Sequence, residues 1–190
     1  VIGDDGLARP PWAATDPLLR DYYDTEWGMP VTDERGVFER LSLEAFQSGL
    51  SWATILRKRP AFRTAFDGFD PERLARWTED DVARALGDPG IVRHRGKIEA
   101  AVGNARAFLA IEDRESFSDF LWRFTGGEPI VNGFAAPQEV PTETAESRAM
   151  SKALRHAGFR FCGPVITYAF MEATGIVNDH LTSCHRHGQV

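Results

Sequence analysis

The stretch SKALRHAGFRFCGPVITYAFMEATG, residues 151–175, decides the fold class. Its first half completes the amphipathic pattern TAESRAMSKALRHAG, which predicts a helix that ends at Gly158. FRFCGP follows as a six-residue hairpin, and VITYAFMEATG predicts a second helix that ends at Gly175. The stretch therefore predicts two helices joined by a tight turn.

Such a hairpin is suited to binding a phosphate. Its backbone N–H groups can point at an anion, and the positive end of the second helix adds to the attraction. Lys152, Arg155, His156 and Arg160 make the approach to the hairpin basic. An ordinary pair of helices with a solvated polar face has the same spacing and is common. By spacing alone, the ordinary helix pair is the favoured explanation.

The rest of the chain also reads as successive helices, with KIEAAVGNARAFLAI continuing the pattern. Helix starts are predicted at Asp16-Pro17, at Thr32 or Asp33, at Pro60, at Asp70-Pro71 and at Thr78. Residues 126–141 are rich in Gly and Pro and read as a loop. Because no segment shows sustained strict alternation, we predict an all-α protein.

Composition narrows the class of protein. The 190 residues, 43% of them apolar, can supply one globular core, and no apolar run approaches the roughly 20 residues of a membrane span. Cys162 and Cys184 cannot make a disulfide framework or a four-thiolate cluster, so we expect a cytoplasmic protein, monomeric by default. A net charge of -6 argues against a general nucleic-acid coat, but not against a DNA enzyme with one basic face.

The segment LEAFQSGLSW, Leu43 to Trp52, predicts a sharp corner between two helices, since Gly49 can stop one and Ser51 can cap the next. Glu44 lies near the edge of the core-facing stripe of the first helix, and the corner brings Glu44 and Trp52 towards one cavity. By spacing alone, an exposed Glu on a helix face is the commoner explanation. The core stripe consists of Val37, Leu41, Ala45 and Phe46.

Several motifs in one order carry a resemblance to a known family. They are DPLLRDYYDTEWG, LEAFQSGLSWATIL, DPGIVRHRGKIEAAVGNARAF, SKALRHAGFRFCGPVITYAFMEATGIVNDH and HLTSCHRH. Over roughly residues 12–184 the chain resembles bacterial 3-methyladenine DNA glycosylase I, a family of helix-hairpin-helix DNA glycosylases. The resemblance divides the chain into an N-terminal segment 1–11, a glycosylase domain 12–184 with its hairpin at about 158–164, and a tail 185–190.

The resemblance implies two helical lobes with a nucleotide pocket between them. It implies a monofunctional DNA-repair enzyme without a cofactor, which flips an N3-alkylated adenine out of double-stranded DNA and hydrolyses its N-glycosidic bond, leaving an abasic site. Two alternatives remain: the same fold retuned for a bulkier N3-adenine adduct, or a non-catalytic helix-hairpin-helix DNA-binding module. A binding module has no need of a pocket carboxylate with an aromatic set.

Five residues match the family's pocket. Trp12, Tyr22, Trp27 and Trp52 match its aromatic positions, and Glu44 matches its carboxylate, which we expect to bind substrate and to be catalytic. A place in the core is the usual explanation for aromatics, but acidic residues interrupt the segment that holds Tyr22 and Trp27. Whether Glu44 recognises the base, stabilises positive charge or orients water is open.

The remaining family positions concern DNA and the type of chemistry. Leu50 resembles a wedge that fills the gap left by a flipped base, although a buried corner leucine is an alternative. Val165 and Ile166 stand where bifunctional relatives carry a Schiff-base lysine, which predicts no lyase activity. Asn178 occupies the slot of a catalytic Asp in other helix-hairpin-helix glycosylases, and Asp179 is not assigned a role. The expected DNA contacts are Leu50, Lys152, Arg160, Phe161 and Gly163.

Two departures from the family stand out. Many relatives join their chain ends through zinc, but this chain keeps only His180 and Cys184, with Arg9-Pro10 and Tyr23 at the other ligand positions. Because a structural zinc site needs four ligands, we predict no metal and expect Tyr23 to pack into the space, although His185 and His187 could in principle substitute. Leu19 replaces a frequent tyrosine near the pocket, which could alter which adducts fit.

Overall fold

The computed structural model describes all 190 residues and is mostly helical, which confirms the predicted all-α class. The helices are α1 (Pro11–Ala14), α2 (Pro17–Thr25), α3 (Glu34–Gln47), α4 (Trp52–Ala65), α5 (Pro71–Ala75), α6 (Glu79–Leu86), α7 (Arg95–Glu112), α8 (Phe117–Trp122), α9 (Ala145–His156) and α10 (Pro164–Ala173). Two-residue strands β1 (Ile130–Val131) and β2 (Val177–Asn178) pair in parallel. None of the helices combines the length and apolar composition that a membrane crossing requires.

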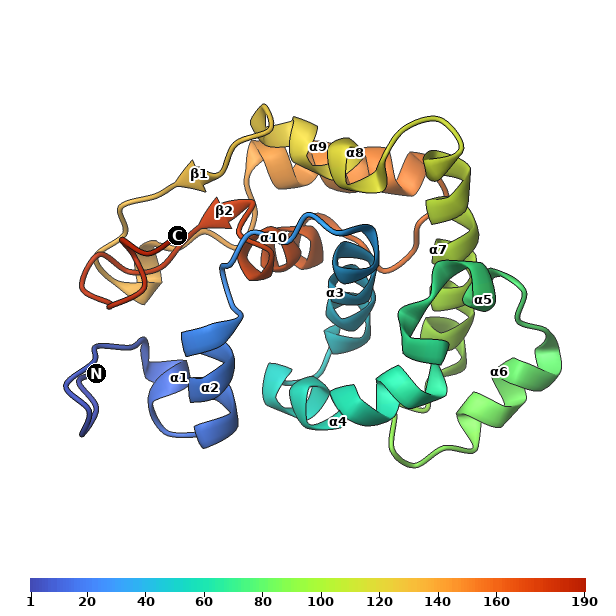
Figure 1. Cartoon of the computed structure of the whole chain (residues 1–190), viewed down its shortest axis with the longest axis horizontal. Coiled ribbons are helices and arrows are strands. Elements are labelled where there is room, and N and C mark those ends of the chain that lie inside the picture. The colour runs from blue at the N-terminus through green and yellow to red at the C-terminus, as the bar shows by residue number, and fades with distance from the viewer.

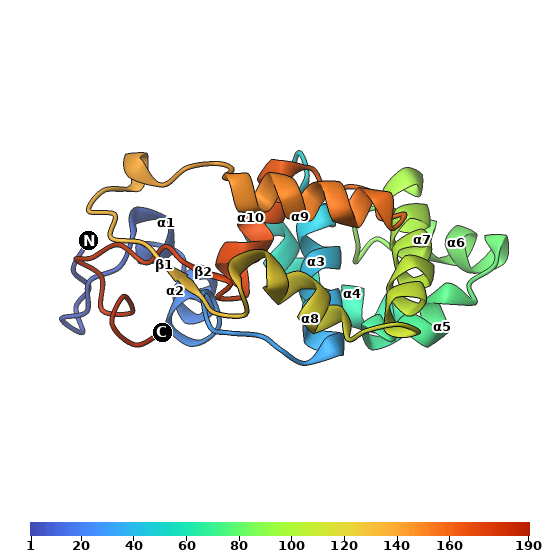
Figure 2. The same cartoon turned by 90° about the horizontal axis from the view of Figure 1, so that it is seen from above.

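The buried apolar residues form two clusters of unequal size. A core of 34 residues is shared by the helices from α3 onwards, and a small cluster of Ala13, Tyr23, Leu181 and Cys184 joins α1 and α2 to the C-terminal segment. Figure 1 shows α1, α2 and both chain ends at one side of the molecule, with α5, α6 and α7 at the other and α3 and α10 between them. The same grouping holds in the perpendicular view (Figure 2).

The predicted corner at Gly49 is confirmed. α3 ends just before it, Gly49 adopts a φ of +79°, and the Ser51 hydroxyl caps α4 by accepting a hydrogen bond from the Thr54 N–H at 3.2 Å. Lys97 on α7 donates to the carbonyl oxygen of Phe46 at 2.8 Å, which satisfies an acceptor that the end of α3 leaves free. The corner is thus held by a hydrogen bond from α7 as well as by its own helix cap.

One predicted helix start is wrong. Pro60 lies inside α4 instead of beginning a helix. A proline in this place removes one backbone hydrogen bond and normally kinks or ends a helix. Here Ile55 and Leu56 before it and Phe62 after it are buried in the core, and their packing keeps α4 continuous. The starts predicted at Pro17, at Pro71 and after Thr78 are confirmed.

The predicted helix, hairpin and helix are also present, as α9, residues 157–163 and α10. The carbonyl oxygen of Cys162 accepts hydrogen bonds from the Ser151 hydroxyl at 2.7 Å and from the Thr167 hydroxyl at 3.0 Å, so the turn is tied to both helices. Phe161 adopts a φ of +56°, which a bulky residue rarely does. The hairpin is therefore a defined turn that holds an unusual backbone conformation.

Candidate active site

A cavity of about 380 Å³ lies where α1 and α2 face α3, α4 and α10. Its volume falls within the range of small-molecule sites, about 300–1,000 Å³. All five residues predicted for the pocket line it, namely Trp12, Tyr22, Trp27, Glu44 and Trp52. Residues that lie 40 positions apart in the sequence, from Trp12 to Trp52, are thus brought to one site.

The aromatic residues surround the cavity in pairs. The ring centroids of Tyr22 and Trp52 lie 5.5 Å apart, and those of Trp12 and Trp27 are also separated by 5.5 Å. Tyr22 is buried, but Trp12 is 39% exposed, so the set does not form a closed core. The Tyr22 hydroxyl and the Trp52 indole N–H are buried without a hydrogen-bond partner in the protein. Buried donors left unpaired are costly, so both groups are available to bind a polar group of a ligand.

Glu44 is only 4% exposed, so the interpretation as an exposed helix-face residue is wrong. Glu44 is buried because of tertiary packing. It lies at the edge of the apolar stripe of α3, and that edge faces the cavity between α2 and α10. Burial raises the pKa of the Glu44 carboxyl to about 8, and the positive charge of Arg40 opposes that rise. A carboxylate among aromatic faces can accept hydrogen bonds from a flat ligand and balance its positive charge.

A second carboxylate, Glu172, which the sequence motifs did not predict, also lines the cavity. Burial holds its pKa well above the usual range, and the carboxylates of Asp179 and Glu44 act in the same direction. Asp179 accepts hydrogen bonds from the Tyr168 hydroxyl at 2.5 Å and from the Asn132 amide at 2.7 Å. The available signal was a single acidic residue within the otherwise apolar helix VITYAFMEATG.

Two of the segments expected to contact DNA, the corner and the hairpin, lie against α7. Leu50, at the tip of the corner, is 38% exposed, so the alternative of a buried leucine is wrong. The rings of His94 and Phe161 lie 6.3 Å apart, which places the hairpin beside His94. Lys97, one helical turn further along α7, binds the corner through the Phe46 carbonyl. The hairpin and the corner therefore flank the same end of α7.

The hairpin is also anchored to α7 through its backbone. The Asn104 side chain accepts a hydrogen bond from the Arg160 N–H at 2.8 Å and donates one to the Arg160 carbonyl at 3.1 Å. The Arg160 and Lys152 side chains are exposed, while the N–H groups of Phe161 and Gly163 have no backbone acceptor. Exposed cations and free N–H groups on a fixed turn are a suitable arrangement for binding a phosphate.

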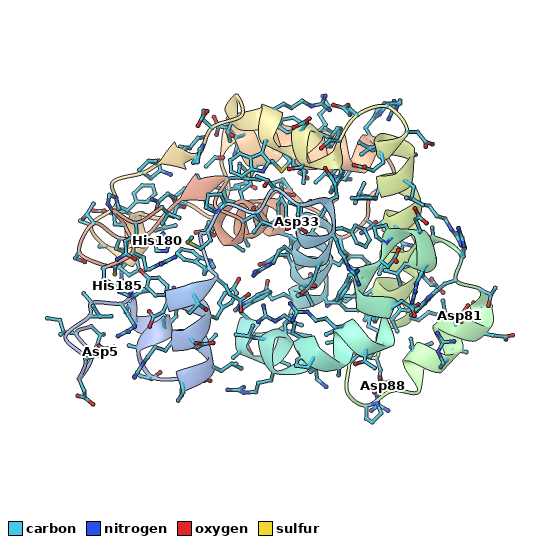
Figure 3. All side chains as sticks on the ribbon, in the orientation of Figure 1. Asp5, Asp33, Asp81, Asp88, His180 and His185 are labelled. Atoms are coloured by element: carbon cyan, nitrogen blue, oxygen red, sulfur yellow. The ribbon has the colours of Figure 1, made fainter.

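A network of charges joins the two chain ends. Arg9, only 3% exposed, donates to Asp24 at 2.6 and 2.8 Å and to Asp5 at 2.7 and 3.0 Å. The His185 ring lies 3.4 Å from the Asp24 carboxylate and 2.9 Å from the Ala8 carbonyl oxygen. Figure 3 shows His185 and His180 at the same end of the molecule as Asp5. These contacts hold the N-terminal and C-terminal segments together beside Trp12 and Trp27.

The residues at the family's zinc positions do not fit a closed zinc site. Tyr23 is fully buried, stacks on Trp27 at 5.8 Å and lies 5.3 Å from the His180 ring. Burial raises the pKa of the Tyr23 phenol, so it stays neutral. Arg9, a buried cation, occupies the position of a thiolate. Four tetrahedral nitrogen or sulfur ligands are therefore not provided.

Comparison with known proteins agrees with this geometry. A profile of the methyladenine glycosylase family matches residues 12–187. The chain is 48% identical over 179 residues to DNA-3-methyladenine glycosylase 1 of Escherichia coli strain K12, covering 94% of this chain and 96% of that protein. It is 46% identical over 177 residues to DNA-3-methyladenine glycosylase of Haemophilus influenzae, covering 93% and 96%.

Solved structures give the same result. A crystal structure of 3-methyladenine DNA glycosylase I superposes with a TM-score of 0.92 at 50% identity, covering 94% of this chain and 98% of that one. The Staphylococcus aureus 3-methyladenine DNA glycosylase I superposes with a TM-score of 0.89 at 39% identity, covering 90% and 92%. On sequence, fold and pocket together, this chain belongs to the methyladenine glycosylase family.

Proposed function

We infer that this chain excises 3-methyladenine from DNA in base excision repair, as a glycosylase that hydrolyses the N-glycosyl bond. The observation that carries this conclusion is the buried, unpaired Glu44 in an aromatic cavity of a chain with this family membership. Relatives that it matches along almost their whole length bear the name DNA-3-methyladenine glycosylase. Direct measurement of the free bases released from methylated DNA tests it.

The pocket chemistry suits this substrate. N3-methylation gives the adenine of a nucleotide a positive charge, so its glycosidic bond is already weak and a strong acid is not required. Tyr22 and Trp52 can stack on the cation, a contact that contributes about 0.5–2 kcal/mol. Ionised Glu44 can accept a hydrogen bond from the exocyclic amino group and can balance both the cationic base and the positive sugar that forms as the bond breaks.

The same geometry favours hydrolysis without strand cleavage. A lyase needs an amine that forms a Schiff base with the sugar. The cavity lining contains no lysine, and α10 begins with Pro164, Val165 and Ile166.

The fixed hairpin, with Lys152 and Arg160 exposed, supplies a phosphate contact that does not depend on base sequence.

Excision is expected to depend on pH through Glu44. Since burial raises the pKa of this carboxyl to about 8 in the free protein, only a minority of molecules carry the ionised form at pH 7. The kcat/KM for release of 3-methyladenine should therefore rise about tenfold per pH unit below that pKa and level off above it. Chromatography of bases released between pH 6 and 9, corrected for spontaneous loss, measures the profile. A flat profile would contradict a role for ionised Glu44.

We also propose that the chain ends are held without zinc, through the ion pairs of Arg9 with Asp5 and Asp24. Protein purified without a histidine tag is expected to contain far less than one zinc per chain, and a chelator should leave its melting temperature unchanged. Elemental analysis and a thermal melt check both expectations. About one tightly bound zinc per chain would refute this proposal and leave the proposed reaction untouched.

A further inference from the structure

Beneath the pocket lies a network of three charged side chains that take no direct part in the proposed reaction. Arg40 on α3 donates to the Glu26 carboxylate at 2.8 Å, and Arg59 on α4 donates to the same carboxylate through two hydrogen bonds of 2.7 Å. The two guanidinium carbons lie 5.8 and 5.9 Å from the centre of the Tyr22 ring. Two cations share one anion, so the network keeps a net positive charge at the pocket floor.

Arg40 stands directly next to Glu44 on the same helix. Positions i and i+4 of an α-helix are surface neighbours, with their Cβ atoms about 5–6 Å apart. One guanidinium nitrogen of Arg40, Nη1, is buried without a hydrogen-bond partner, and the Glu44 carboxylate likewise has no ion pair. The charge of Arg40 is the one that lowers the pKa of Glu44 against the effect of burial.

The other groups around Glu44 do not replace this charge. Glu172, which lines the same cavity from α10, supplies no positive charge, and burial together with the carboxylates of Asp179 and Glu44 holds its pKa well above the usual range. Tyr22, facing from α2, is neutral because burial raises the pKa of its hydroxyl. Arg59, on α4, donates both of its side-chain hydrogen bonds to Glu26. Arg40 is therefore the cation best placed to act on Glu44.

We propose that Arg40 is a positioning residue for base excision: held by Glu26, it keeps a positive charge beside Glu44 that favours the ionised, hydrogen-bond-accepting form of this carboxylate. Glu26 is essential to the arrangement. A direct Arg40–Glu44 ion pair would also favour ionisation, but it would occupy the oxygens that the base must reach. Because Glu26 holds the Arg40 guanidinium, the charge acts on Glu44 while its oxygens stay free.

This inference rests on the role proposed for Glu44, but the ionisation itself can be measured without substrate. In protein labelled with ¹³C at glutamate side-chain carboxyls, the Glu44 signal is assigned by its loss in Glu44→Gln and followed between pH 5 and 10. The wild-type midpoint is expected near 8. Arg40→Met should raise the midpoint by about one pH unit or more, since it removes a unit charge at short range in a poorly solvated site. Arg40→Lys should stay close to wild type.

Two further variants make the test specific. The control variant is Arg63→Met. Arg63 also joins α4 to α3, through an ion pair with Glu39 at 2.7 Å. Its removal should leave the titration midpoint of Glu44 unchanged. Glu26→Gln removes the anion from the network, so it should lower the midpoint, opposite in sign to Arg40→Met. A midpoint that does not move in Arg40→Met, or one that rises in Glu26→Gln, would overturn the proposal.

Activity provides an independent readout. Arg40→Met should shift the acid side of the excision profile to higher pH by the same amount as the carboxyl midpoint, with its high-pH plateau retained. A residue that only supports the fold would lower release equally at every pH, and this result would also overturn the proposal. If wild-type protein released no 3-methyladenine at any pH, the proposed function would fail, whereas the carboxyl titration would still decide whether Arg40 controls Glu44.

Discussion

The Glu44→Gln variant is expected to release 3-methyladenine at least about 100-fold more slowly than the wild type in single-turnover assays, as when one transition-state contact is lost from other active sites. Glutamine has nearly the same size as glutamate, so the cavity keeps its shape. It carries no negative charge to balance the cationic base and the developing sugar cation. Chromatography of released bases, with enzyme in excess over methylated duplex, gives the rate.

The loss of activity should not come from unfolding. Burial raises the pKa of Glu44 to about 8 from an ordinary value of 4.5, so the unfolded chain loses this proton first as the pH rises. The folded state is therefore progressively disfavoured between about pH 4.5 and pH 8. Glu44→Gln, which has no proton to lose, should be at least as stable as the wild type and should gain relative stability across that interval. Release at the wild-type rate by this variant would exclude a catalytic role for Glu44 and leave family membership intact.

Gly175→Ala is expected to have the largest effect on stability, about 3 kcal/mol or more. Gly175 adopts a φ of +70°, and an added Cβ would lie 2.6 Å from the Pro30 nitrogen and 2.7 Å from the Gly28 carbonyl oxygen. These are backbone atoms, which cannot turn aside as a side chain can. The contact joins the end of α10, which carries Glu172, to the segment after Trp27, so excision should fall as well.

Gly103→Ala is the matched control. Gly103 lies within α7, and an added Cβ there would meet no atom within 4 Å. Replacing a helical glycine by alanine at an open position should leave stability unchanged or increase it by about 0.5–1 kcal/mol. Denaturant unfolding of both variants measures the difference. A Gly175→Ala protein as stable as Gly103→Ala would show that this backbone contact is not made.

The parts of this structure that could be predicted from the sequence are those set by local chemistry. Gly49 and Ser51 define the corner because a positive φ and a side-chain cap each depend on neighbouring residues only. The two helices that flank the hairpin are likewise set by their own patterns and by Gly158. Family motifs then selected five pocket residues that share one cavity, although spacing alone favoured an exposed Glu44.

The parts that could not be predicted depend on contacts between distant segments. Lys97 reads as an ordinary helix-face lysine, yet it is buried against a carbonyl 51 residues away. Arg40 has no local signal for its position beneath the pocket, since Glu26 and Arg59 come from other elements. By local rules Pro60 predicts a helix start. This prediction is wrong because core packing on both sides of Pro60 keeps α4 continuous, and local rules do not include that packing. The lone acidic residue of VITYAFMEATG marks Glu172 in the sequence, but its place in the cavity depends on the packing of α10 against α3.

The most direct test of the proposed glycosylase function is the identity of the free base that wild-type protein releases from methylated double-stranded DNA. We expect 3-methyladenine in solution, with the DNA strand intact until the abasic site is cleaved by alkali. Binding of the duplex without release of 3-methyladenine would instead identify a DNA-binding module and exclude glycosylase activity.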